Sequence, residues 1–154
     1  MPESLRTLLA PYPVVVAAPA QWAEMDANRH INNVVYLEWV EASRIAYFEQ
    51  IGMMDFGKQA IGPILSRVSC KYVYPLTYPD QVWIGTRAVA LGADSFLLEA
   101  AVFSTRHHRL AALSETDVVC LDYQTRRKAP LPSDLRQRIL ELEQQTELPW
   151  FGRR

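Results

Sequence analysis

One long helix followed by four strand-like runs is the feature that most constrains the fold of this 154-residue chain. Apolar residues recur at a helical period between Asn33 and Ile51, and Gly52 follows as a natural stop. The period predicts a buried helix face made of Val34, Leu37, Val40, Ala42, Ile45 and Phe48, and Trp39 and Tyr47 are expected to thicken its apolar side. Such a face has to be covered by another layer, and the strands that follow can supply it.

Period-two alternation replaces the helical period from Pro63 onward and predicts strands over residues 64–74, 81–91, 96–105 and 110–123. An earlier strand is expected over 12–22, with Pro19 placing it at a sheet edge or bulge. Ser133 is expected to cap a terminal helix over about 133–146. Consecutive strands without interleaved helices predict an α+β fold, in which a curved antiparallel sheet of about five strands wraps around a long central helix.

Composition narrows the class of protein. Sixteen basic and seventeen acidic residues give a net charge of −1, which argues against a broad nucleic-acid or anionic-membrane surface. The longest apolar run near the N-terminus, residues 13–18, is too short to span a bilayer and lacks the layout of a signal peptide, so a cytoplasmic protein is expected. Cys70 and Cys120 have no cysteine or histidine partner at zinc-ligand spacing, and we infer no metal site.

A cluster of polar side chains comes directly before the predicted central helix. Residues 25–36 read Met-Asp-Ala-Asn-Arg-His-Ile-Asn-Asn-Val-Val-Tyr. One carboxylate, one imidazole and two carboxamides therefore gather where a helix presents unpaired N–H groups and the positive end of its dipole. Taken alone, an Asp or Asn before a helix is usually only a cap or turn residue.

The order Asp, three residues, His, an aliphatic residue, Asn-Asn, two residues, Tyr, over residues 26–36, closely resembles the signature of hotdog-fold acyl-CoA thioesterases of the 4-hydroxybenzoyl-CoA thioesterase type. The resemblance extends over about residues 14–132. It implies that the whole chain, residues 1–154, is a single hotdog thioesterase domain with its core over about 12–132.

The resemblance implies roles for two residues. Asp26 matches the catalytic carboxylate, which either attacks the thioester carbonyl to form a mixed anhydride or activates a water molecule. Asn33 matches the position whose backbone N–H, at the start of the central helix, polarises the carbonyl and stabilises the developing oxyanion.

Four neighbouring residues are supporting candidates. His30 is expected either to contact substrate or water or to fix the loop through the backbone, while Asn32 either contacts substrate or caps the helix. Tyr36 is expected to pack toward the pocket, with its hydroxyl orienting the loop. Arg29 stands where relatives usually carry glycine, so the loop is expected to differ in shape. Its side chain either meets coenzyme A phosphates or is solvated.

The sequence thus predicts an acyl-CoA thioesterase that uses Asp26 and no metal or redox cofactor, coenzyme A being part of the substrate. Two rivals remain: a hotdog-fold hydratase or dehydratase of enoyl thioesters, with Asp26 and His30 as its acid and base, and a non-catalytic acyl-CoA binder. Free sheet edges favour a homodimer or homotetramer. The family resemblance implies that the active site then forms at the interface between copies, with the partner contributing part of the pocket.

Overall fold

The computed structural model describes residues 1–54 and 60–152 and shows one sheet with a long helix on one face. Its elements follow the predicted order closely. They are α1 (Glu3–Leu9), β1 (Val14–Ala20), the 3₁₀ helix η1 (Trp22–Glu24), α2 (Asn33–Gln50), β2 (Ile61–Tyr72), β3 (Asp80–Leu91), β4 (Ser95–Ser104), β5 (Arg109–Asp122), β6 (Arg127–Lys128) and α3 (Ser133–Leu142).

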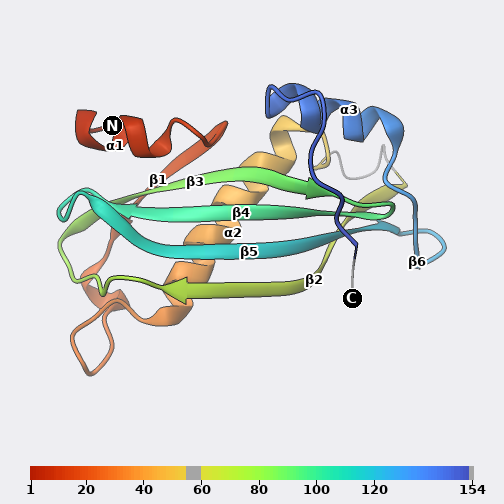
Figure 1. Ribbon diagram of the computed structural model, residues 1–154. Helices are drawn as coiled ribbons and strands as arrows, with labels where there is room; N and C mark the ends of the chain where they lie inside the picture. Colours follow the sequence, from red (N-terminus) through yellow and green to blue (C-terminus); the bar gives the residue numbers. More distant parts are fainter. Residues whose placement is uncertain (55–59, 153–154) are drawn as a thin grey trace.

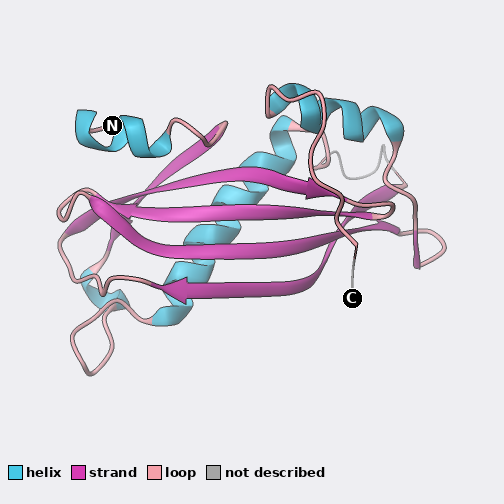
Figure 2. Cartoon of the chain, in the orientation of Figure 1, coloured by secondary structure: helices cyan, strands magenta, loops and turns pink. Residues whose placement is uncertain are grey.

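The strands are antiparallel and lie in the order β1-β3-β4-β5-β2, with the short β6 added to β5. Figures 1 and 2 show α2 crossing behind this sheet, with α1 and α3 toward its two ends. The predicted α+β hotdog architecture is therefore confirmed. Pro19 lies in β1, which is an edge strand as expected and pairs with β3.

Local sequence sets both ends of α2. The side chain of Asn32 accepts a hydrogen bond from the Val34 N–H (3.0 Å) and caps the first turn. At the other end Gly52 adopts φ 69°, and the N–H groups of Gly52 and Met53 bond back to the carbonyls of Glu49 and Phe48. These two hydrogen bonds form a Schellman motif, which explains why the helix ends at the predicted glycine.

The prediction of which face α2 buries was partly wrong. The residues packed against the sheet are Val35, Tyr36, Trp39, Val40, Ser43, Arg44, Tyr47 and Phe48. Val34 and Ile45 are exposed instead, as is Ala42, and Leu37 is only half buried. The helix carries apolar side chains on two faces, and the larger aromatic set is the one that fills the space under the sheet.

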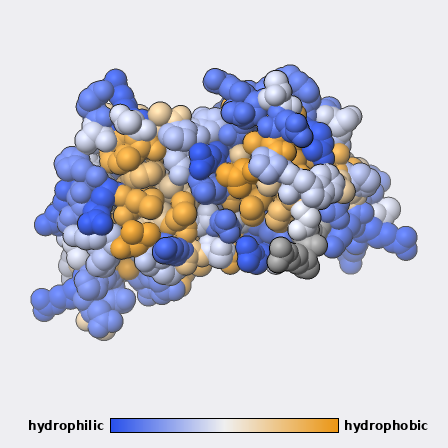
Figure 3. Space-filling model, viewed as in Figure 1, coloured by the Kyte–Doolittle hydropathy of each residue, from blue (hydrophilic) through white to orange (hydrophobic). Residues whose placement is uncertain are grey.

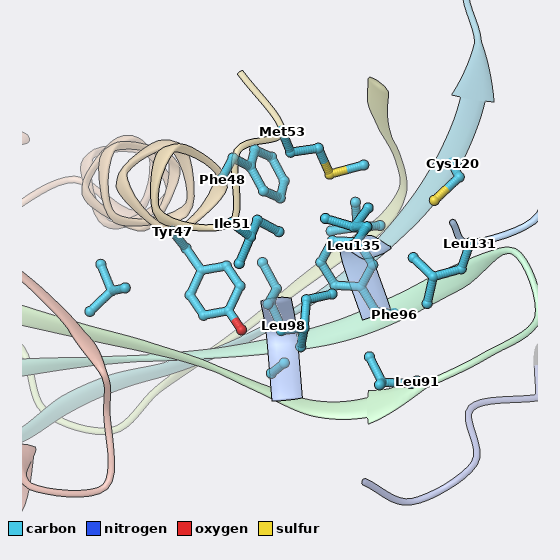
Figure 4. Packing of buried hydrophobic residues seen from close by; sticks show 14 of the residues in the cluster. Tyr47, Phe48, Ile51, Met53, Leu91, Phe96, Leu98, Cys120, Leu131 and Leu135 are labelled. Atoms are coloured by element: carbon cyan, nitrogen blue, oxygen red, sulfur yellow. The ribbon is translucent and has the colours of Figure 1, made fainter. Parts of the chain in front are cut away.

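Two apolar clusters lie along α2. One surrounds the N-terminal half of the helix, with Val35 and Val40 facing Ile84 and Val102 of the sheet. The other surrounds the C-terminal half, where Figure 4 shows Tyr47, Phe48 and Ile51 with Phe96 and Leu98 from β4 and with Leu135 from α3. The terminal helix thus closes one end of the core.

Polar contacts at Glu143 fix the C-terminal end of α3 to the core. A carboxylate oxygen of Glu143, directly after the helix, accepts hydrogen bonds from the Tyr47 hydroxyl and the Ala88 N–H, both at 2.6 Å, and burial raises the pKa of this acid. Ser133 is the first residue of α3 and not its cap, which is Pro132, and the helix ends at Leu142 instead of near residue 146.

The β2 edge of the sheet is the most exposed part of the fold. All residues from Ile64 to Ser69 are exposed, although the sequence alternation predicted one buried face. The reason is that α2 packs mainly against β1, β3 and β4, which leaves little over β2 at the end of the strand order. Figure 3 shows that the sheet face turned away from α2 also carries apolar areas, part of which α1 covers by packing over Phe103 and Ala101.

Candidate active site

The predicted polar cluster forms a short hairpin-like loop between η1 and α2. Met25 and Ile31 make an antiparallel bridge, and the Asp26 N–H donates to the His30 carbonyl (2.9 Å). Inside the loop, the Arg29 N–H donates to the Asp26 carbonyl (2.9 Å), which closes a tight turn. The carboxylate Oδ1 of Asp26 accepts the Asn28 N–H (2.8 Å), so one oxygen of this side chain is held by its own loop.

Arg29 adopts the left-handed conformation, with φ 60°. A turn followed by one left-handed residue is a common way to close a hairpin, and glycine is the usual residue there because it has no Cβ to clash. Arg29 thus adopts a backbone conformation that glycine favours.

A surface cavity of about 270 Å³ brings most of the predicted residues together. Asp26, His30 and Asn33 line it together with the ring of Tyr36. Its opposite wall is the end of β2 and the residues that follow, in Figure 1 the corner where the β2 arrowhead meets the start of α2. Those wall residues are Tyr72, Val73, Tyr74 and Pro75.

The start of α2 is suited to hold negative charge at this cavity. Asn33 is the first helical residue, and its N–H has no partner within the helix. The cap from Asn32 engages the Val34 N–H and does not use that of Asn33. A carbonyl oxygen placed in the cavity can therefore meet an N–H donor at the positive end of the helix dipole.

Two tyrosines hold the walls of the cavity in place. The hydroxyl of Tyr36 accepts the Leu76 N–H (3.2 Å), while the Leu76 carbonyl accepts the Ile31 N–H (2.8 Å). Burial raises the pKa of Tyr36 to about 12, so it stays protonated at neutral pH. The hydroxyl of Tyr72 donates to the Asn33 carbonyl (3.2 Å), and its ring meets that of Tyr36 edge to face. Tyr36 thus packs at the cavity, and its hydroxyl is linked to the loop only through Leu76.

The other candidates divide between the cavity and its surroundings. The backbone carbonyl of His30 fixes the loop, while its imidazole lines the cavity and makes no hydrogen bond within the described part of the chain. Asn32 caps α2 and is not among the lining residues. Arg29 lines a neighbouring cavity that also includes Asp26.

The wall from β2 was missed as part of the site. Helical and strand periods cannot show that Tyr72 and Val73 come to lie against the start of a helix about forty positions earlier. A signal did exist, because the family resemblance extends over about residues 14–132 and includes this segment, but no role was assigned to it.

The described residues hold neither a metal-ligand cluster nor a membrane-spanning helix. Over residues 1–54 and 60–152, no three His, Cys, Asp or Glu side chains are grouped so that they could hold a metal ion. No described helix has the length and apolar character needed to cross a membrane.

Comparison with known proteins defines the class. A thioesterase of Thermus thermophilus, crystallised with coenzyme A and zinc, superposes with a TM-score of 0.78 at 31% identity, over 88% of this chain and 97% of that one. The long-chain acyl-CoA thioesterase FadM of Escherichia coli K12 is 22% identical over 77% of this chain and 90% of its own length. The uncharacterised protein YsmA of Bacillus subtilis 168 is 30% identical, over 51% of this chain and only 52% of its own length.

The fold is that of a hotdog-fold thioester hydrolase. The profile of the thioesterase-like superfamily matches residues 20–139, and the chain belongs to that family.

Proposed function

We propose that the chain hydrolyses an acyl-CoA to the free acid and coenzyme A at the cavity between the Asp26 loop and α2. The observation that carries this proposal is that Asp26 and Asn33, the first residue of α2, line one cavity together. The coenzyme A bound to the Thermus relative and the substrate in the name of FadM support acyl-CoA as the substrate class.

The proposed chemistry needs two groups from the protein. The Asp26 carboxylate either attacks the thioester carbonyl carbon, so that the thiolate leaves and water then cleaves the anhydride, or takes a proton from the attacking water. In both routes negative charge develops on the carbonyl oxygen, and the Asn33 N–H stabilises it. Loss of one such donor typically lowers the rate about 10²–10³-fold.

The supporting residues act on this geometry. We propose that the His30 imidazole contacts substrate or water in the cavity, that Asn32 acts by capping the helix that carries Asn33, and that Tyr36 holds the cavity wall. Because Asp26, the helix amide and water suffice for thioester cleavage, we propose that no metal or redox cofactor is needed. A cytoplasmic location stays a prediction from the sequence.

Thiol release from a panel of acyl-CoAs tests the function. Wild-type protein is expected to release thiol, and Asp26→Asn and Asp26→Ala are expected to lose most of that activity. Hydration of an enoyl-CoA without thiol release would contradict the proposal. So would wild-type turnover in both variants.

We also propose that a second copy of the chain completes the site. The side of α2 that carries Val34 and Ile45 is exposed, and the neighbouring strand β2 exposes Ile64, Leu65 and Val68. An exposed apolar helix face beside a long exposed edge strand is a surface that isologous pairing of two copies would cover. Val34 and Val68 line a cavity in this surface, and Val34 directly follows Asn33 in the sequence.

The association state tests this second proposal. Val68→Lys is expected to raise the dissociation constant of the dimer at least tenfold, because it places a charge in the apolar face, and to lower activity with it. Lys71→Arg, on the same strand, keeps its charge and serves as the control. Sedimentation velocity over a range of protein concentrations measures both, and a wild-type protein that stays monomeric throughout would contradict the proposal.

A further inference from the structure

A second cavity of about 470 Å³ adjoins the proposed active site. It is lined by Trp22, Ala23, Met25, Asp26 and Arg29. Asp26 lines both cavities, so the two lie on either side of this residue.

The substrate of the proposed function is too large for the first cavity alone. Pockets that enclose a drug-sized ligand measure about 300–1,000 Å³, and the cavity at Asn33 has about 270 Å³. An acyl-CoA carries a nucleotide, a pantetheine arm and an acyl group, so most of it has to lie on the neighbouring surface. The protein offers two neighbouring cavities of different chemistry.

A third cavity, of about 230 Å³, includes Val34, the residue directly after Asn33. It is lined by the apolar residues Val34, Leu37 and Val68 and by the charged residues Glu38, Glu41 and Arg44. Arg44 is almost fully buried and contacts Glu41 (3.7 Å). Two exposed carboxylates repel phosphate, while the apolar side chains suit an acyl group. The nucleotide is therefore directed the other way, toward Trp22 and Arg29.

Trp22 offers a flat aromatic surface to solvent. Its side chain is 71% exposed, which is unusual for the largest apolar residue, and it does not belong to the buried clusters. The backbone around it is well held, because the Gln21 N–H donates to the Glu24 carboxylate (2.7 Å) and the Glu24 N–H to the Gln21 carbonyl (3.1 Å). An exposed ring on a fixed turn is a surface on which a base can stack.

Arg29 supplies positive charge at the same cavity. It occupies a left-handed position that any residue with a Cβ adopts at a cost, and glycine would close the loop more cheaply. The side chain is exposed and makes no ion pair within the described residues. A guanidinium in such a place can bind phosphate oxygens in a bidentate way.

We propose that Trp22 and Arg29 form the subsite for the nucleotide end of coenzyme A, with the indole stacked on the adenine and the guanidinium on a phosphate. This inference rests on the proposed acyl-CoA substrate. The thioester then lies at Asp26 and Asn33, between the nucleotide on one side and the acyl group on the other.

The basic run Arg126–Lys128 is the competing location. Within one chain it lies at the other end of the sheet: Figure 1 shows the Asp26 loop in orange at the lower left and the turn before β6 at the right. A coenzyme A whose nucleotide is bound there could bring its thioester only to the Asp26 of a second copy of the chain.

Two thioesters that differ only in the nucleotide test the subsite. Steady-state kinetics are measured with an acyl-CoA and with the same acyl group on N-acetylcysteamine, which keeps the thioester and lacks the nucleotide. Trp22→Ala and Arg29→Gly are each expected to raise the KM for the acyl-CoA on the order of tenfold, with kcat unchanged. Neither is expected to change turnover of the short thioester, and Trp22→Phe is expected to retain much of the affinity.

Matched controls come from the other end of the molecule. Trp150 is 70% exposed, and Arg126 has φ 56°, so Trp150→Ala and Arg126→Gly repeat the same changes away from the cavity. Both are expected to leave the two substrates unaffected. A selective loss for acyl-CoA in Arg126→Gly would place the nucleotide at the basic run and overturn the proposal.

Binding of adenosine 3′,5′-bisphosphate, measured by calorimetry, tests the subsite without any turnover. Wild-type protein is expected to bind it, and Trp22→Ala and Arg29→Gly to bind it on the order of tenfold more weakly. If wild-type protein binds the bisphosphate and cleaves neither thioester, the proposed function fails and the subsite stands. Equal losses of activity on the acyl-CoA and the N-acetylcysteamine thioester in Trp22→Ala and Arg29→Gly would overturn the subsite. A change in the association state of Trp22→Ala without any change in its KM would also overturn it.

Discussion

Two loops of this chain are built alike and lie in different surroundings. In each, the Oδ1 of an Asp accepts backbone N–H groups of its own loop, one at Asp26 and two at Asp122. In each, an Arg in the left-handed conformation follows in the turn, Arg29 and Arg126. The Asp26 loop lies beside two cavities and the start of α2. The Asp122 loop joins β5 to β6 at the opposite end of the sheet. Similar local geometry therefore does not by itself mark an active site.

The largest expected difference between the loops is in catalysis. Asp26→Asn keeps an oxygen that can accept the Asn28 N–H but removes the carboxylate, so thiol release is expected to fall by about 10² or more. Asp122→Asn makes the same change in the other loop and is expected to retain activity. Equal losses in both variants would show that the loops act on folding and not on the reaction.

A tyrosine beside each loop gives the second comparison. Tyr72 donates to the Asn33 carbonyl (3.2 Å) and Tyr123 to the Pro63 carbonyl (2.6 Å), and both side chains are about half exposed. Tyr72→Phe is expected to lower kcat about threefold to tenfold, since it frees the start of α2. Tyr123→Phe is expected to leave kcat unchanged. Both variants are expected to lose about 0.5–1 kcal/mol of stability, because each removes one hydrogen bond. Urea unfolding and thiol release measure the two effects separately.

The two arginines are expected to behave alike in stability. Arg29→Gly and Arg126→Gly each remove a Cβ from a left-handed residue, and each is expected to raise the free energy of unfolding by about 0.5–1 kcal/mol. This corresponds to a rise of about 1–4 °C in melting temperature for a chain of this size. A loss of stability in Arg29→Gly alone would show that the arginine side chain holds its loop together.

The smallest expected effect is on acid stability. The N–H groups of Thr125 and Gln124 hold the pKa of the Asp122 carboxyl below its ordinary 3.8. This lowered pKa contributes stability that is present above the unfolded value and lost as pH falls through the folded one. The advantage of wild type over Asp122→Asn is therefore expected to shrink below about pH 4, as measured by urea unfolding between pH 3 and 6. A constant difference over that range would contradict the role of these bonds.

Most elements of the fold were predictable because their signals are local. The end of α2 at Gly52 follows from a single glycine in the left-handed conformation, and the start at Asn33 from the capping side chain of Asn32. The strands β3, β4 and β5 were predicted to within about a residue at each end, since their alternation matches one face packed on α2.

The errors came where two local choices were nearly equivalent. The helix α2 has apolar side chains on two faces. The prediction that Trp39 and Tyr47 belong to the buried side is confirmed, but the sequence also placed Val34 and Ile45 there, and both are exposed. In β2 the alternation predicted a buried face, yet burial depends on what lies over the strand. The tertiary fold decides the buried face of α2 and the burial of β2, because burial depends on how whole surfaces pack together and not on single positions.

The sequence by itself determined the Asp26 loop, the start of α2 behind it and the family resemblance that singled out Asp26 and Asn33. Hydrogen bonds between residues two to four positions apart form the turn itself, while the Ile31 N–H is held by the distant carbonyl of Leu76. Only the tertiary structure decided that Tyr72 and Val73 form the opposite wall, and that Trp22 and Arg29 line a second cavity beside the same carboxylate. A cavity needs walls from segments far apart in the chain, and the packing of the whole sheet on α2 brings them together.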